Sequence, residues 1–428
     1  MSDPLRLGIA GLGTVGVGVV RIVQKHAALL QTRSGRAIEI TAVSARSKGK
    51  DRGVDLAGYA WEDDPVQLAQ RDDVDVFLEL MGGSDGPAKA ATEAALAAGK
   101  DVVTANKALL AHHGQALALA AEGAGRVIRF EAAVAGGIPV VKALTEGLAG
   151  NEISRIVGVM NGSCNYILTR MEDAGLSYQA VFDEANNLGY LEADPELDVG
   201  GIDAGHKLAL LSSIAFGTQV NFDGVDLEGI GSVTIEDIHQ AADMGYKIKL
   251  LGVAQMTGRG LEQRMSPCLV PDSSPLGQLQ GGTNMVVLEG DSVGQIVLRG
   301  PGAGEGPTAS AVMGDVVDLA RGLRISTFGQ PASTLRETRA AHSAVPAPYY
   351  LRLQLIDKPG ALAKVAKVLG EAGISIDRMR QYGHDDTAAP VLIVTHKTTR
   401  TALNEALQAF ETTDVVEGTP VAIRIEAV

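Results

Sequence analysis

A lysine and a carboxylate that could hold an amino acid and move a proton lie within residues 186–207. Asp203 opens an apolar run with the period of a helix, and Lys207 follows four residues later. Their side chains are therefore expected one turn apart on one helix face. Taken alone, the stretch is better explained as a solvated acidic loop with an ordinary exposed ion pair than as a binding site, because such pairs are common and weak. The same stretch also contains Glu192, Asp194, Glu196, Asp198 and His206.

A second candidate site is a glycine-rich turn near the start of the chain. Residues 5–10 have the pattern of a buried strand, and after the turn a helical pattern continues to about Gln24. A strand, G-x-G-x-x-G and a helix in this order indicate a dinucleotide site, whose pyrophosphate lies on the helix N-terminus. The alternative is a glycine-rich turn without a ligand. The turn consists of Gly11, Leu12, Gly13, Thr14, Val15 and Gly16.

The loop after the second expected strand, residues 38–43, bears on which dinucleotide binds. An acid usually stands there to bind the ribose of NAD, whereas an arginine can accept the 2′-phosphate of NADP. Residues 44–48 contain Arg46 and Lys48 and no acid. The sequence therefore favours NADP and leaves NAD possible, unless the two cations merely solvate a loop.

Lys107 follows another expected strand, residues 101–104, at the carboxyl edge of the sheet. Ligands of open α/β sheets bind along that edge, so Lys107 is placed to meet a substrate or the nicotinamide. His112 and His113 lie in the next helix and are expected at the surface, since no third metal ligand of suitable spacing is evident. Cys164 has no His–Asp company in the sequence and is expected to be a buried structural thiol.

Two further segments with glycines could approach the same site. Residues 131–139 combine Glu131 with a turn on glycines, and such a loop can offer backbone carbonyls to a hard cation. From the residues alone, a plain interdomain turn is the preferred interpretation. Residues 300–315 begin with a turn of four glycines before a helix of small residues. We expect the chain to return to the cofactor cleft there.

The composition limits the partners and the location. The chain has 428 residues and a formal net charge of −14, which argues against a nucleic acid or an anionic membrane as partner. The 2 cysteines cannot form a disulfide framework and fit a reducing cytosol, so a cytoplasmic location is expected. No apolar run approaches the length of a membrane span.

The expected elements make an α/β protein of three units. Residues 1–131 plus 300–325 form a Rossmann dinucleotide-binding domain. Residues 132–299 form an α+β domain for substrate binding and oligomerisation, with a largely antiparallel sheet. Residues 326–348 carry prolines and scattered charges with little apolar period and are predicted to be a linker. Residues 349–428 alternate as β-α-β-β-α-β, the ferredoxin-like order.

Six motifs follow one another along the chain, in residues 11–16, 104–107, 131–139, 161–168, 189–207 and 302–312. As an ordered set they closely resemble the homoserine dehydrogenase family. Residues 357–362 and 373–376 resemble an ACT domain, an amino-acid-sensing module. One departure is Ser163-Cys164, where many members have two threonines, so a hydroxyl contact at position 164 is in doubt.

This resemblance implies NAD(P)-dependent interconversion of L-homoserine and L-aspartate 4-semialdehyde, in the biosynthesis of threonine, methionine and isoleucine. Threonine feedback through the ACT domain is suggested. Lys207 would exchange the proton with the alcohol oxygen, and Lys107 would lie between nicotinamide and substrate. The other implied contacts are Glu192 and Asp203 to the substrate ammonium with Asp198 in support, Gly189 and Gly304 to the cofactor, and Glu131, Val134, Gly136 and Ile138 to a sodium-like cation.

Two alternatives remain: a non-catalytic sensor of a dinucleotide and an amino acid, and a dehydrogenase of another amino-acid semialdehyde. The intact Lys107, Lys207 and acids speak against a sensor, which has no use for a proton donor. If a cofactor lies opposite residues 186–207, this stretch is expected to be a substrate site. Asp194, Glu196 and His206 are still expected to be solvated residues without a role in the site. A homodimer or homotetramer is expected, because symmetric assembly is the default for such enzymes.

Overall fold

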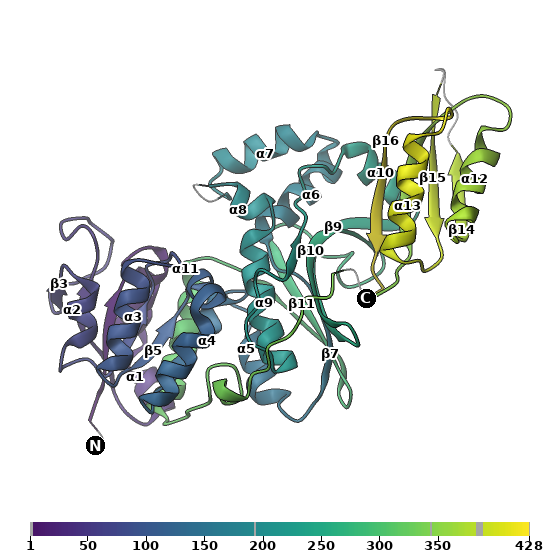
Figure 1. Cartoon of the computed structure of the whole chain (residues 1–428). Helices are drawn as coiled ribbons and strands as arrows, with labels where there is room; N and C mark the ends of the chain where they lie inside the picture. The colour runs from purple at the N-terminus through teal and green to yellow at the C-terminus, as the bar shows by residue number, and fades with distance from the viewer. Residues whose placement is uncertain (1–2, 192–193, 343–344, 382–387, 428) are drawn as a thin grey trace.

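The computed structural model describes residues 3–191, 194–342, 345–381 and 388–427. Three units follow one another in space from the N-terminus to the C-terminus, and the second lies between the other two (Figure 1). None of the helices in the described ranges has the length and apolar character that a bilayer span requires. The predicted α/β class, with a parallel sheet, a separate mixed sheet and a C-terminal βαββαβ unit, is confirmed.

The N-terminal unit is a parallel sheet with the strand order β3-β2-β1-β4-β5-β6, covered by helices on both faces. Its strands are apolar on both faces, as parallel strands between two helix layers must be. The strands are β1 (Leu5–Ala10), β2 (Ile38–Ser44), β3 (Ala60–Glu62), β4 (Val76–Glu79), β5 (Asp101–Thr104) and β6 (Ile128–Arg129). The helices are α1 (Thr14–Ser34) and α11 (Glu305–Ala320) on one face, with α2 (Pro65–Gln70), α3 (Pro87–Ala97) and α4 (Lys107–Gly123) on the other.

Two details of this unit differ from the sequence expectation or extend it. Helix α1 continues to Ser34, past a kink at His26, and not only to about Gln24. Helix α11 packs against α1, so the segment after the glycine turn at 300–306 does return to the first sheet. Short turns then lead into the second unit: η1 (Glu131–Ala133), α5 (Val140–Lys142) and η2 (Ala143–Gly147).

The second unit is a largely antiparallel sheet with helices on one side (Figure 1). Its strands follow the order β12-β11-β7-β9-β10, and β8 pairs with β10 off that path. The strands are β7 (Ile153–Val159), β8 (Val225–Leu227), β9 (Tyr246–Thr257), β10 (Gly260–Pro271), β11 (Thr283–Gly290) and β12 (Gly294–Pro301). The helices are α6 (Gly162–Ala174), α7 (Tyr178–Asn187), α8 (Glu196–Val199), α9 (Ile202–Phe216) and α10 (Ile235–Asp243).

The C-terminal unit has the predicted six elements in the predicted order. They are β13 (Tyr349–Ile356), α12 (Ala361–Glu371), β14 (Ile376–Gln381), β15 (Ala388–Thr395), α13 (Arg400–Glu411) and β16 (Val416–Ile425). Its sheet is not isolated, because β16 pairs in parallel with β10 at Cys268–Arg424 and Leu269–Ile425. One continuous sheet thus joins the second and third units.

The segment predicted to be a linker is packed against the folded units: Ala332 is hydrogen-bonded to Gln115 and Glu122 of α4, and other parts lie on the second unit. Phe328 is 1% exposed and belongs to the main core, and a short turn, η3 (Ala332–Thr334), follows. Isolated bridges join Arg336 to Thr218 and Ala340 to Leu261. We call residues 326–342 the strap. Its few apolar residues lack a regular period, so the sequence could not show that they are buried.

Candidate active site

Asp203 accepts from two lysines that come from different units of the chain. Its Oδ2 lies 2.6 Å from Lys207 Nζ, and its Oδ1 lies 2.8 Å from Lys107 Nζ. Lys207 also donates to the backbone carbonyl of Met160 over 2.9 Å. The predicted i,i+4 pair is therefore present, and Lys107 joins it from the start of α4.

The Asp203–Lys207 pair is buried and Lys107 is half-buried, which excludes a solvated ion pair here. Asp203 is 7% exposed and Lys207 is 8% exposed. Burial alone would raise the pKa of Asp203, but the charges of Lys207 and Lys107 hold it well below its usual value. The carboxylate therefore stays ionised, and the three groups carry a net positive charge. Such a charge is suited to stabilising a substrate oxygen that becomes negative.

Helix α9 places Asp203 and Lys207 because it is buried along almost its whole length. It begins after Gly201, which has a φ of 82°, and packs against α4, β9 and β10. Asp203 stands in its first turn, where a carboxylate also meets the positive end of the helix dipole. Helices α4 and α9 pack against each other and thus bring the two lysines together.

The start of α4 is fixed by a chain of hydrogen bonds at the carboxyl edge of the first sheet. Thr104 Oγ1 donates to the buried Glu79 carboxylate over 2.7 Å and accepts from Asn106 N–H over 2.9 Å. The Asn106 side chain caps the helix by accepting from Leu109 N–H and donates to the Gly83 carbonyl. Lys107, the first residue of the helix, is therefore held in place by its neighbours.

Asp198 lies in α8, which packs against α9, and it is buried. It accepts from Asn161 Nδ2 over 2.9 Å, and Asn161 in turn caps α6 at Cys164 N–H. Cys164 is fully buried and donates to the Asp198 carbonyl over 3.3 Å. Burial raises the pKa of this thiol, and the predicted burial of Cys164 is confirmed.

Two predicted contact residues, Gly189 and Gly304, have positive φ at helix ends. Gly189, with a φ of 73°, follows α7, and Gly304, with a φ of 120°, precedes α11. The residue after Gly189 is tied to α6, since Tyr190 stacks on Tyr166 at 4.5 Å and its carbonyl accepts from the hydroxyl of Ser163. Glu192 lies outside the described residues.

The glycine turn at 11–16 fits a dinucleotide phosphate. Gly11 has a φ of 101°, and a Cβ there would collide with the Leu80 carbonyl. A Cβ on Gly16 would collide with the Gly11 carbonyl, so both positions require glycine. Gly13 faces open space, and no side chain caps the start of α1. The free N–H groups of that helix terminus are thus available to an anion.

The basic loop after β2 contains a residue that sequence reasoning missed. Arg52 donates from Nε to the Leu12 carbonyl over 3.2 Å and from Nη2 to the Ser47 carbonyl over 2.7 Å. Its guanidinium also lies 5.7 Å from the Trp61 ring. Arg52 therefore ties the glycine turn to the loop that carries Arg46, whose side chain is exposed. Nothing in the linear spacing marks it, because Arg52 lies outside residues 44–48, where a ribose-binding group is expected.

The loop at 131–139 is buried and tightly turned. Glu131 accepts from Val141 N–H and Lys142 N–H, and burial, aided by the charge of Asp315, raises its pKa to about 7. Ala135 and Gly136 have consecutive positive φ values of 56° and 48°.

The backbone carbonyls of the same loop are oxygen ligands of the type that a hard cation prefers. Those of Glu131 and Ile138 accept one N–H each, from Val134 and Val140, which leaves each a lone pair. Oxygen donors near buried carboxylates suit such an ion. In the described ranges, no group of three or more His, Cys, Asp or Glu side chains could hold a metal ion.

His206 is buried, contrary to the solvated interpretation. It is 8% exposed, its ring lies 4.2 Å from that of Phe222, and burial lowers its pKa to about 4. His112 is exposed as predicted and His113 is partly so. The interpretation of His206 failed because its burial depends on contacts with His112 and Phe222, which are distant in the sequence.

Comparison with known proteins agrees with this arrangement. A family model described as "Homoserine dehydrogenase" matches residues 139–317, and one described as "Homoserine dehydrogenase, NAD binding domain" matches residues 11–131. An ACT domain model matches residues 349–413.

Individual relatives match along the whole chain. A homoserine dehydrogenase of Neisseria gonorrhoeae is 42% identical over 432 residues, covering 99% of both chains, and one of Pseudomonas aeruginosa is 40% identical, also covering 99% of both. A crystal structure of a homoserine dehydrogenase from Thiobacillus denitrificans superposes with a TM-score of 0.93 at 39% identity, covering 99% of this chain and 98% of that one.

Proposed function

The chain belongs to the homoserine dehydrogenase family, an NAD(P)-dependent oxidoreductase family, and on that premise we propose how its own residues perform the reaction. The substrates are L-homoserine and L-aspartate 4-semialdehyde, and Lys207 is the proton donor and acceptor. The observation that supports this most is the buried Asp203 carboxylate, which holds Lys207 and Lys107 together.

Lys207 acts on the oxygen that changes between alcohol and aldehyde. The bound nicotinamide supplies or accepts the hydride. An ammonium has three N–H donors, and Asp203 and the Met160 carbonyl take two of those of Lys207, so the third can meet the substrate oxygen. In reduction Lys207 gives that proton, and in oxidation it takes the proton back. Lys107 adds positive charge between the nicotinamide and the substrate.

The substrate ammonium is bound by carboxylates of the same stretch. A carboxylate has about four acceptor positions. Asp203 uses two of these acceptor positions for the lysines, so it can also accept a hydrogen bond from the substrate ammonium. Asp198 supports the site, and Glu192 is the second ammonium ligand in this proposal. The Asn161 side chain holds Asp198 in place.

NADP is the preferred cofactor in this proposal, and NAD remains possible. The turn 11–16 would hold the pyrophosphate, Gly189 and Gly304 would contact the cofactor, and Arg46 would bind the 2′-phosphate. The support for NADP is the lack of an acid at residues 44–48, together with Arg52, which fixes the loop that carries Arg46.

A sodium-like cation held by Glu131, Val134, Gly136 and Ile138 is part of the same proposal. It would brace the loop between the first two units and offset the charge of Glu131. The support is that the Glu131 and Ile138 carbonyls each keep a lone pair, in a loop that also holds the buried Glu131 carboxylate.

Three broader expectations remain proposals. The enzyme serves the biosynthesis of threonine, methionine and isoleucine in the cytoplasm. It is a homodimer or homotetramer. An amino acid, threonine first among the candidates, regulates it through the ACT domain, which 349–413 matches.

A direct assay tests the proposed reaction. The purified protein should reduce NADP+ in the presence of L-homoserine, and other amino alcohols should be much poorer substrates. Better turnover of another amino alcohol would identify a dehydrogenase of a different semialdehyde. Binding of cofactor and homoserine without turnover would identify a sensor.

A further inference from the structure

A cavity of about 380 Å³ lies where the second and third units meet. This is within the size range of small-ligand sites. One wall comes from β8, β10 and the strap, and the other from β13, α13 and β16. We call it the junction cavity. Its charged lining consists of Asp226, Glu228, Arg264, His342, Arg400 and Arg424.

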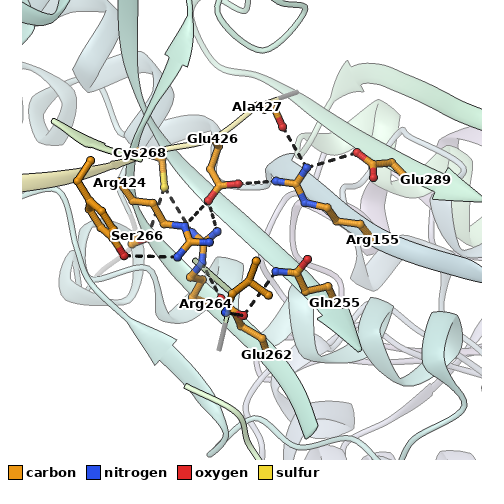
Figure 2. Close-up of polar contacts among 12 residues, drawn as sticks. Arg155, Gln255, Glu262, Arg264, Ser266, Cys268, Glu289, Arg424, Glu426 and Ala427 are labelled. Carbon is orange, nitrogen blue, oxygen red and sulfur yellow. Dashed lines mark hydrogen bonds and ion pairs between the residues drawn. The ribbon is translucent and has the colours of Figure 1, made fainter. Parts of the chain in front are cut away.

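Two buried arginines form its base, and one of them has spare donors. Arg264 is 4% exposed and Arg424 is 8% exposed, and both donate to the Glu426 carboxylate behind the cavity (Figure 2). Arg424 also reaches the Tyr349 hydroxyl through Nη1, at a long 3.5 Å. Its Nη2 has no hydrogen-bond partner among the described residues. This edge lines the cavity, where it can donate to an acceptor that enters.

Arg400 and Glu228 stand on different walls of the cavity and do not pair. Arg400 is the first residue of α13, and Glu228 follows β8. Within the described ranges neither side chain makes a hydrogen bond or an ion pair. Burial raises the pKa of Glu228, and the positive charge of Arg400 acts against that rise. Both side chains line the same cavity and yet do not pair. Their separation leaves room for a molecule that carries both signs.

We propose that the junction cavity binds a small α-amino acid as a zwitterion. Its carboxylate is held by Arg400 and the spare edge of Arg424, and its ammonium is held by Glu228. Arginine forks match carboxylates in two hydrogen bonds, and the start of α13 adds the positive end of a helix dipole. A simple anion would leave Glu228 without a partner, and a simple cation would face three arginines.

The cavity also touches the helix that carries the candidate active site. Leu227 and Met265 line the cavity on one side and pack on α9 on the other. A Cβ on Gly205 would lie 2.9 Å from Leu227 Cδ2, and one on Gly201 would lie 3.5 Å from Met265 Cβ. A bound ligand would thus be one side chain away from the helix of Asp203 and Lys207. This regulatory consequence depends on the proposed function, but the binding itself does not.

Calorimetric titration of the full chain, without cofactor or substrate, tests the site. The probes are L-threonine, L-isoleucine and L-methionine, with sodium acetate and methylamine hydrochloride as ligands of a single charge. We expect at least one amino acid to bind, and both single-charge ligands to bind at least about 10-fold more weakly. No binding by any of the three amino acids, or acetate binding as tightly as the best of them, would overturn the proposal.

Two variants locate the bound amino acid. Arg400→Gln and Glu228→Gln should each weaken binding about 10-fold or more, because each removes one charge-assisted contact. Lys367→Gln, on the exposed side of α12, is the matched control and should bind as wild type does. Unchanged affinity in both cavity variants would place the amino acid elsewhere. Because the readout needs no turnover, this failure is distinct from a failure of the dehydrogenase assignment.

Discussion

At the scale of residues, one buried carboxylate organises the candidate chemistry. Asp203 gives one oxygen to each lysine, so the two ammonium groups lie near each other despite their repulsion. Without that carboxylate, the buried Lys207 and the half-buried Lys107 would repel each other, and one lysine would lose its proton or turn away. Asp203 therefore fixes both the position and the charge of the lysines.

Replacing Lys207 by alanine should lower kcat for homoserine oxidation about 10²- to 10⁴-fold, the usual contribution of a positioned proton donor. The dissociation constant for NADPH should change little, and Asp203 keeps Lys107 as a partner, so the fold should persist. Steady-state kinetics and fluorescence titration measure the two effects. Lys25→Ala, at an exposed position on α1, is the control. Turnover near that of wild type would remove Lys207 from the mechanism.

Glu131 should make the protein less stable as the pH rises from about 4.5 to about 7. Its pKa rises from 4.5 to about 7 on folding, so the folded state binds more protons in this interval. The free energy of unfolding should therefore fall with pH, by about 3 kcal/mol in total. Denaturant unfolding at several pH values should show this decline in wild type and not in Glu131→Gln. Glu93→Gln, an exposed change on α3, should keep it.

The same experiment tests the proposed cation. A bound cation lowers the pKa of a nearby carboxylate, so sodium should reduce the decline of stability with pH. Replacing sodium by tetramethylammonium at constant ionic strength should make the decline steeper. Equal slopes in both salts would argue against a sodium-like ion at this loop.

At the scale of elements, the loop after β2 and the glycine turn act as one binding surface, because Arg52 connects them. Arg46 and Arg52 make different contacts in this arrangement. Arg46 is exposed and can bind the 2′-phosphate, whereas the N–H groups of Arg52 donate to backbone carbonyls.

Arg46→Ala should therefore raise the KM for NADPH about 10-fold or more and leave that for NADH nearly unchanged, since a charge-assisted contact to the 2′-phosphate is lost. Arg52→Ala should weaken both cofactors together, because the turn at 11–16 loses its support. Parallel assays with NADPH and NADH measure this difference. An equal effect of Arg46→Ala on both cofactors would show that Arg46 does not read the phosphate.

At the scale of the whole molecule, a charge cluster joins the C-terminal unit to the second. Glu426, just beyond β16, is 4% exposed and accepts from Arg155, Arg264 and Arg424 (Figure 2). Burial alone would raise the pKa of Glu426, but these arginines hold it below its usual value. Its contribution to stability is therefore present above the unfolded pKa and is lost as the pH falls.

Glu426→Gln should destabilise the junction by about 3–5 kcal/mol, because buried arginines lose their counter-charge. Calorimetry at neutral pH should show a lower-temperature transition for the C-terminal unit, while the dinucleotide-binding unit unfolds as before. Asp414→Asn, which breaks exposed pairs with Lys358 and Lys364, is the control and should change little. A single unchanged transition in Glu426→Gln would show that the sheet contact alone holds the units together.

Features within one element could be read from the sequence. The i,i+4 spacing sets Asp203 beside Lys207, and strand, turn and helix at 5–16 have their required order within a few residues of each other. The six elements after residue 348 were likewise predicted in order, because each has its own apolar period. Backbone geometry alone determines such relations, since neighbours along a helix or strand are neighbours in space.

Contacts between elements were decided only by the tertiary structure. Lys107 reaches Asp203 because α4 packs against α9, and Arg52 reaches Leu12 because its loop folds back over the glycine turn. The burial of His206 and Phe328, and the meeting of three arginines at Glu426, have no local signal at all. The sequence determined which residues could do chemistry, and packing between distant segments determined which of them meet, because burial and charge pairing depend on every surface that closes around a group.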